Sequence, residues 1–391
     1  MIFIRKTLCH ALYITVLMLV ASCVRDDTLD NRTTKTVLVY MAADNTLSDY
    51  AISNVMSMSN SMTADMHYAN LLVYVDRKNV NPALLHLHDR RIDTIKVYDK
   101  EQNSADARVL NDVIKTVIND WKAESYGLIL WSHGMAWIPE SQMNAVAGKQ
   151  GWAPMRYGSS TKSFASKDIS NGNLSYTCME IDELAGAIPE GVFDYIAFDA
   201  CYMGSVEVLY ALRKKAPYII SSSCEIIGDG FPYRRVTSDF LSGNVTKVCT
   251  EFFSYYNSYS GFQQTASISL VNTDGLDSLA RCFKKIVATH KNEIPTLNVS
   301  DIQYFDRFEK HVMFDLEDFV DKLGTDNEDL TEFRLQLEKC VSYKNSTPYI
   351  CNEIKMNTFC GLSVYIPLEA FEASGLNDDY RDTEWSRDTG Y

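Results

Sequence analysis

The amino-acid sequence predicts an α/β protein built on a mostly parallel sheet, and three observations lead to this fold class. Short apolar runs alternate with amphipathic helical segments along most of the chain. Two runs, residues 126–131 and 195–198, are apolar without alternation, which is typical of strands that helices cover on both faces. A helix predicted from Ser205 to Arg213 connects the second run to a third, residues 218–222. Such crossovers pair strands in parallel, and sites then form at the carboxyl ends of the strands.

The other elements of the first half follow from the same periodicities. Residues 36–41 (TVLVYM) are a β-branched and apolar run that predicts the first strand. The apolar positions after this run fall three and four residues apart and predict a helix: Leu47, Ala51, Val55, Met58 and Met62. Residues 70–75 and 84–87 predict two more strands, and residues 109–121 predict a helix with one strongly apolar side.

After about residue 240 the pattern resumes in a part that we expect to form a smaller C-terminal subdomain, residues 246–391. Its predicted elements are a strand at residues 266–271, helices at residues 279–286 and 314–323, and a last strand at residues 361–366. One of its strands is available to extend the main sheet.

The composition is that of a globular protein and argues against a nucleic-acid partner. The 391 residues are 46% hydrophobic and 23% charged, with a formal net charge of -14. No run rich in lysine and arginine is present that would follow a phosphate backbone. The ten cysteines include no Cys-x-x-Cys pair and mostly stand singly in apolar segments, so we expect neither a zinc ribbon nor a disulfide framework. His86 and His88 share one face of a predicted strand without a third ligand nearby, so we predict no metal site.

The N-terminus has the layout of a secretory signal. Arg5 and Lys6 precede an apolar stretch, residues 8–21, and small residues follow it. The stretch is short for a stable membrane span. We therefore expect residues 1–23 to form an export signal that ends at Cys23.

The end of this signal resembles a bacterial lipobox. Residues 20–23 (VASC) place Cys23 where the lipidated cysteine of a mature lipoprotein would stand, and residues 24–33 would then serve as a polar tether. Asp26 and Asp27 resemble the acidic tag of surface-displayed lipoproteins. The expectation is an exported protein anchored by lipid at the outer membrane, facing the periplasm or the cell surface. The alternative is a plain cleavable signal with an incidental cysteine.

Reactive side chains directly follow the two best-defined strands. Residues 126–131 run into His133, and residues 195–198 run into Cys201. If these strands are parallel neighbours, the imidazole and the thiol emerge at one edge of the sheet, where the imidazole can exchange a proton. The N–H groups of Gly134 and Cys201 would then be placed to hold an oxyanion. The alternative is a buried structural cysteine beside a histidine that only forms a hydrogen bond.

Four ordered motifs resemble those of clostripain-type cysteine peptidases, which are relatives of caspases, gingipains and legumains. The motifs are residues 39–45 (VYMAADN), 128–134 (LILWSHG), 198–204 (FDACYMG) and 225–233 (EIIGDGFPY). The resemblance implies a caspase-like α/β/α sandwich in which residues 34–245 are the catalytic domain. It also implies a cysteine endopeptidase that acts on proteins or peptides and needs no cofactor for its chemistry. A calcium ion is compatible with the family, and this sequence assigns no ligands to one.

The resemblance assigns roles residue by residue. Cys201 aligns with the nucleophile, and His133 aligns with the histidine of a dyad that protonates the leaving amine. Asp199 and Asp229 align with the acidic lining of the S1 pocket, which would select Arg or Lys at P1 by charge-assisted hydrogen bonds. The alternative for these two carboxylates is a turn cap and an ordinary turn residue. Two other readings stay open: a peptidase with small P1 residues, and a catalytically idle surface lipoprotein that binds a peptide in the cleft.

The polar segment at residues 140–178 separates the two motifs, and the resemblance implies that it is an activation linker. Family members are often zymogens that cut themselves after a basic residue between the histidine and the cysteine. Lys149 is the first candidate and Arg156 the next, with Lys162 and Lys167 as further alternatives. The alternative is a flexible surface loop that any protease can cut.

Overall fold

The computed structural model describes residues 33–99, 102–142, 146, 164–169, 175–324 and 327–391. Within this part of the chain, Thr33–Tyr391 forms one compact unit. The signal segment and Cys23 lie outside the described residues. None of the helices in the described ranges combines the length and the hydropathy that a membrane span requires.

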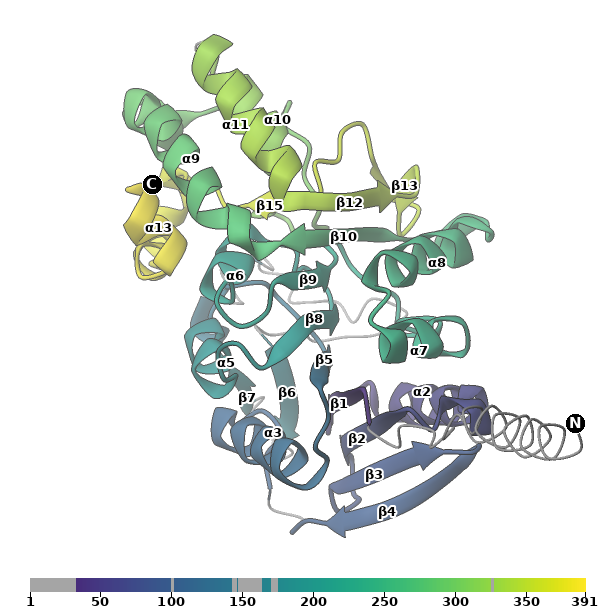
Figure 1. Ribbon diagram of the computed structural model, residues 1–391. Helices are drawn as coiled ribbons and strands as arrows, with labels where there is room; N and C mark the ends of the chain where they lie inside the picture. Colours follow the sequence, from purple (N-terminus) through teal and green to yellow (C-terminus); the bar gives the residue numbers. More distant parts are fainter. Residues whose placement is uncertain (1–32, 100–101, 143–145, 147–163, 170–174, 325–326) are drawn as a thin grey trace, which may run out of the picture. The chain divides into compact units, whose positions relative to one another are not determined.

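A nine-stranded sheet, in the order β12-β10-β9-β8-β5-β1-β2-β3-β4, forms the centre of the described structure (Figure 1). Its strands are β1 (Lys35–Ala43), β2 (Ala69–Arg77), β3 (Ala83–His88), β4 (Arg91–Val97), β5 (Ser125–Trp131), β8 (Phe193–Asp199), β9 (Tyr218–Ser221), β10 (Ser267–Asn272) and β12 (Val341–Ser346). The neighbours from β9 through β8, β5 and β1 to β2 are parallel. The outer strands pair antiparallel.

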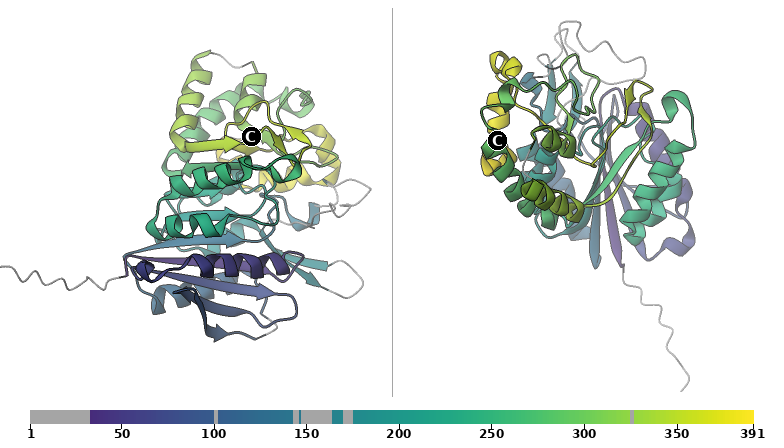
Figure 2. Two further views of the ribbon diagram at one scale, coloured as in Figure 1. Left: turned by 90° about the vertical axis from the view of Figure 1, so that its right-hand side faces the viewer. Right: turned by 90° about the horizontal axis from the view of Figure 1, so that it is seen from above.

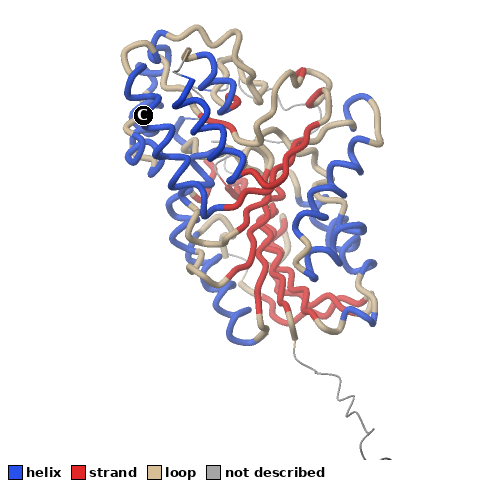
Figure 3. The backbone as a smooth tube through the Cα atoms, turned by 45° about the horizontal axis from the view of Figure 1, so that its top comes forward, coloured by secondary structure: helices blue, strands red, loops and turns tan. Residues whose placement is uncertain are grey.

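Helices cover both faces of this sheet (Figure 3). One face carries α3 (Ala107–Asp120), α5 (Ile181–Ala187), α6 (Val206–Ala211) and α9 (Leu276–His290), and the other carries α2 (Ser48–Ser61), α7 (Tyr233–Ser242) and α8 (Val245–Asn257). In β1, Leu38 and Tyr40 face the first core while Val37 and Val39 face the second. Two buried faces explain why this strand is apolar at every position from Val37 to Ala43. The predicted α/β/α architecture with a mostly parallel sheet is confirmed.

The chain beyond α8 continues the central sheet with β10 and β12, and further helices pack beside these strands (Figure 2). The remaining elements are β11 (Phe314–Asp315), α10 (Leu316–Lys322), α11 (Asn327–Cys340), β13 (Tyr349–Ile350), β14 (Ile354–Lys355), β15 (Ser363–Val364), α12 (Leu376–Arg381) and α13 (Glu384–Thr389). Short 3₁₀ helices are η1 (Ala64–Met66), η2 (Glu140–Gln142), η3 (Gly261–Gln263), η4 (Thr273–Gly275), η5 (Ile294–Thr296) and η6 (Glu369–Ser374). The division into two domains at about residue 245 stays a prediction.

Two segments differ from the expected elements. Residues 361–366 contain only the two-residue strand β15, which pairs with β11 outside the main sheet. Tyr365 and Ile366 are fully buried there, so the apolar run reflects burial rather than a place in the sheet. The polar linker contains a hairpin of β6 (Phe164–Ile169) and β7 (Ser175–Met179), which its composition did not predict.

Candidate active site

The two strands that precede the reactive residues are parallel neighbours. β5 and β8 pair along their length, and Trp131 lies opposite Asp199 at the carboxyl end. The Ser132 N–H donates to the Asp199 carbonyl at 3.3 Å and extends this pairing by one residue. His133 and Cys201 each follow the last paired position by two residues, so both emerge at the same edge of the sheet.

The turns that carry these residues touch through Gly134. A Cβ atom added to Gly134 would lie 2.4 Å from the Cys201 carbonyl oxygen and 3.0 Å from the Met203 sulfur. Because real Cβ atoms do not approach so closely, only glycine permits this contact between the two turns. The N–H groups of Gly134 and Cys201 form no hydrogen bond with another described residue.

His133 is held by the loop that follows β1. Its Nε2 lies 2.9 Å from the Thr46 hydroxyl, and the residue is 2% exposed. Burial, together with the positive charge of Lys78, lowers the pKa of His133 to about 3. The ring is therefore neutral at neutral pH. Thr46 directly follows the first family motif, residues 39–45, and this position is the one sequence feature that could have identified it as a partner of His133.

The Cys201 thiol is also engaged. Its Sγ donates to the Ile226 carbonyl at 3.5 Å and accepts the Ile226 N–H at 3.3 Å. Burial, together with the negative charge of the Glu225 carboxylate, raises the pKa of Cys201 to about 12. The helix α6 begins only at Val206, so its N-terminus is not adjacent to the sulfur.

Tyr202, the residue after Cys201, has a φ of 62°. Left-handed backbone is costly for a bulky side chain and concentrates at functional sites. No hydrogen bond joins His133 to Cys201 among the described residues, since each is bonded to another partner. The imidazole is bonded to Thr46 and the thiol to Ile226.

Asp199 and the turn that contains Asp229 lie together. Asp199 is 4% exposed, and its Oδ2 accepts the Phe231 N–H at 3.0 Å and the Tyr233 hydroxyl at 2.8 Å. Burial raises the pKa of Asp199 to about 6, although both hydrogen bonds act in the opposite direction. Gly230 has a φ of 65°, and a Cβ there would lie 2.5 Å from Asp199 Oδ2. Asp229 is exposed on this turn, so one carboxylate is buried and the other faces solvent.

Other predicted residues lie elsewhere or outside the described part. Lys149, Arg156 and Lys162 fall outside the described residues, and Lys167 is in strand β6. The rings of His86 and His88 stack at 4.7 Å on β3, where His88 Nε2 lies 2.8 Å from Asp93 Oδ2. The described residues contain no group of three His, Cys, Asp or Glu side chains arranged to hold a metal ion. The cysteines of the described ranges are all free.

Comparisons with known proteins point to one family. The profile of the clostripain family matches residues 39–370. Clostripain from Hathewaya histolytica is 24% identical over 242 residues, which are 54% of this chain and 43% of clostripain. The matched part of this chain thus spans less than half the length of that relative.

Solved structures align over nearly the whole chain. An inactive protease zymogen from Parabacteroides distasonis is 32% identical with a TM-score of 0.76, and the match covers 91% of this chain and 98% of that one. A secreted cysteine protease from Bacteroides thetaiotaomicron, solved with an irreversible peptide inhibitor, is 29% identical with a TM-score of 0.75. That match covers 91% of this chain and 99% of the other.

Proposed function

Since this chain belongs to the clostripain family, we propose that it is a cysteine endopeptidase in which Cys201 is the nucleophile and His133 the proton donor. The observation that carries this proposal is the contact between the two turns, where the Gly134 backbone lies directly against the Cys201 carbonyl. This contact keeps the thiol, the imidazole and the N–H groups of Gly134 and Cys201 at one edge of the sheet. The arrangement contains each group that acyl transfer to sulfur requires.

The proposed reaction proceeds through a thioester. The neutral His133 imidazole takes the proton from the Cys201 thiol as the sulfur attacks the scissile carbonyl carbon. The oxyanion that forms is held by the N–H groups of Gly134 and Cys201. The C–N bond then breaks as His133 gives a proton to the leaving amine. Water hydrolyses the thioester and restores the thiol. For these steps to occur, the imidazole must break its hydrogen bond with Thr46 and the sulfur must break its hydrogen bond with Ile226.

We propose that the preferred P1 residue is Arg or Lys. The support is the buried Asp199 carboxylate, two residues before Cys201, which accepts the Phe231 N–H from the turn that carries the exposed Asp229. Fluorogenic peptides that differ only at P1 test this directly. Arg and Lys peptides should be cleaved at least about tenfold faster than the Ala peptide, because a charge-assisted hydrogen bond contributes about 1.5–3 kcal/mol. A preference for Ala would favour the peptidase with small P1 residues, and no cleavage of any peptide would favour the idle peptide-binding lipoprotein.

The selectivity for basic P1 residues should depend on pH. Asp199, with a pKa raised to about 6 by burial, is negatively charged above that pH and neutral below it. We therefore expect the ratio of kcat/KM for Arg over Ala peptides to fall as the pH drops from 8 through about 6 to 5. Taking the ratio removes any titration that affects both peptides equally. A ratio that stays constant over this range would contradict the role of Asp199, and the Asp199→Asn variant should show no such transition.

We propose that the chain matures by cutting itself in the linker, after Lys149 or Arg156. The support is the position of both residues between the two halves of the dyad, together with a structural relative that is an inactive zymogen. Incubation of the purified chain should give two fragments whose masses add up to the whole plus one water. The Cys201→Ala chain should stay intact, and Lys149→Ala should shift or block the cut. Equal cleavage with and without Cys201 would show that another protease makes the cut.

We also propose export and a lipid anchor at Cys23. The support is the signal-like N-terminus and a structural relative that is a secreted protease. The intact mass of the mature protein shows both where the signal is cut and whether Cys23 carries acyl chains. A chain that begins at Cys23 with the added mass of acyl chains supports the anchor, and an unmodified mature N-terminus supports the plain signal instead.

A further inference from the structure

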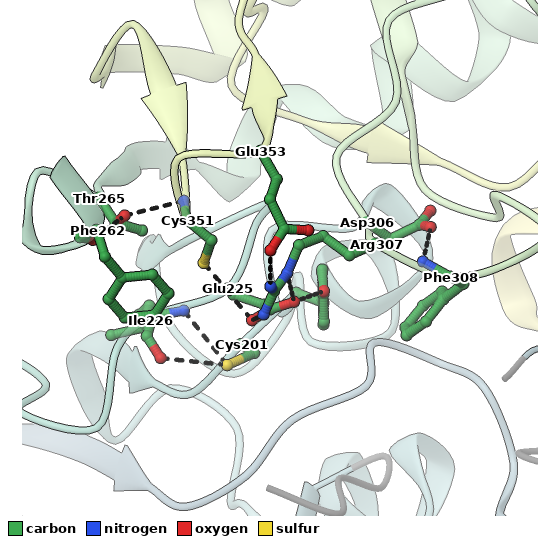
Figure 4. A network of polar contacts seen from close by, with 11 residues as sticks. Cys201, Glu225, Ile226, Phe262, Thr265, Asp306, Arg307, Phe308, Cys351 and Glu353 are labelled. Carbon is green, nitrogen blue, oxygen red and sulfur yellow. Dashed lines mark hydrogen bonds and ion pairs between the residues drawn. The ribbon is translucent and has the colours of Figure 1, made fainter. Parts of the chain in front are cut away.

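A buried ion pair lies next to the sulfur and joins the C-terminal part of the chain to the active-site turn (Figure 4). Arg307 donates from Nε to Glu225 Oε1 at 3.0 Å and from Nη2 to Glu225 Oε2 at 2.8 Å. Its Nη1 donates to Glu353 at 2.7 Å. The side chains of Arg307 and Glu225 are only 11% and 14% exposed. This fork-to-fork geometry fixes both the distance and the orientation of the Glu225 carboxylate.

The Glu225 carboxylate is connected to the nucleophile from two sides. Tyr202, the residue after Cys201, donates its hydroxyl to Glu225 Oε1 at 2.7 Å. Ile226, the residue after Glu225, brackets the Cys201 sulfur with its N–H and its carbonyl. A displacement of Glu225 therefore moves both the turn that carries the sulfur and the backbone that holds it.

We propose that Arg307 is a positioning residue for Cys201: by pairing with Glu225 it holds the Ile226 N–H on the sulfur and offsets the negative charge beside it. This role rests on the proposed function, since it matters only if Cys201 is the nucleophile. It brings the C-terminal part of the chain into the active site. Without this pair the Glu225 charge would stand alone in a buried place beside a group that must become an anion.

Charged and titratable groups face the sulfur from several elements. Glu225 comes from the segment after β9, Asp199 from the end of β8, and Arg307 from the segment before β11. Cys351 lies in the turn between β13 and β14, with its Sγ 3.7 Å from Glu225 Oε2. Both carboxylates raise the pKa of the thiol, and Arg307 lowers it. Loss of the Arg307 charge therefore reduces the thiolate fraction at a given pH, and loss of the Glu225 charge increases it.

Alkylation of Cys201 by iodoacetamide measures this effect without any peptide substrate. The modification rate at Cys201, resolved from the other cysteines by peptide mapping, follows the thiolate fraction. Between pH 7 and 9, Arg307→Met should slow it about tenfold and Glu225→Gln should speed it about tenfold, as a pKa change of about one unit in either direction requires. Arg307→Lys keeps the charge and should stay within about threefold of the parent chain.

A matched control is Arg213→Met. Arg213 is a 9% exposed arginine that pairs with Asp277 and Glu384 away from the sulfur, and its loss should leave the rate at Cys201 unchanged. If Arg307→Met and Glu225→Gln shift the alkylation rate at Cys201 in the same direction, or if neither shifts it, the positioning role of Arg307 is overturned. If Arg307→Met does not fold, an absence of acceleration in Glu225→Gln overturns it equally. A parent chain that is alkylated at Cys201 but cleaves no peptide would refute the proposed function and leave this inference open to the same test.

Discussion

Replacement of Cys201 with alanine is expected to lower kcat/KM for the best peptide by at least about 10⁴-fold, because the covalent route is removed and water is a poor substitute for a thiolate. The folded state should tolerate the change. Among the described residues the sulfur forms hydrogen bonds only with the Ile226 backbone, so the free energy of unfolding should fall by no more than about 1 kcal/mol. Initial rates give the change in kcat/KM, and thermal unfolding of the same preparation gives the change in the free energy of unfolding.

Cys249→Ala is the matched control for this variant. Cys249 is a fully buried thiol in α8, and burial alone raises its pKa. Its replacement should leave kcat/KM within about twofold of the parent chain while costing similar stability. Equal loss of activity in both variants would show that packing, and not the sulfur of Cys201, determines the rate.

Gly134→Ala should also lower activity strongly, for a geometric reason. The added methyl group would lie 2.4 Å from the Cys201 carbonyl oxygen, a backbone atom that cannot rotate away. The two turns must then separate, and a displacement of about 1 Å at a reacting group costs about 10²-fold in rate. Overpacking of a buried contact also costs about 1–3 kcal/mol of stability. We expect both effects, measured as kcat/KM and as the unfolding midpoint.

Gly186→Ala shows what the same substitution does where space is available. Gly186 lies in α5, and no atom comes within 4 Å of the added Cβ. This variant should be neutral or slightly stabilised, since alanine favours the helix by about 1 kcal/mol. An unchanged kcat/KM in Gly134→Ala would mean that the contact between the two turns has no part in catalysis.

The central strands were predictable because their sequences report burial directly. β5 and β8 are covered on both faces, and their apolar runs end where the reactive residues begin. The two edge strands of the sheet, β4 and β12, give no such signal. β4 is exposed at each position, and β12 alternates between exposed and half-buried residues, so neither has the apolar periodicity that identifies a strand.

The two reactive residues of the site were predictable for the same reason, and their supporting contacts were not. His133 and Cys201 each stand directly after a recognisable strand. Thr46 is 87 residues away from His133 in the sequence, and Arg307 is 82 residues away from Glu225. Contacts of this kind depend on how loops from distant parts of the chain pack, and no local pattern encodes that packing. The arginine in particular comes from a segment that carries no motif.

We propose that the adjacent strands β5 and β8 bring His133 and Cys201 to the same edge of the sheet, where both act on one peptide bond. The most direct measurement is labelling by a peptide acyloxymethyl ketone with arginine at P1, followed by mapping of the adduct. The account predicts one adduct, on Cys201, which is absent in Cys201→Ala and strongly reduced in His133→Ala. Labelling on another cysteine, or labelling of Cys201 that is equally fast without the imidazole, would contradict it.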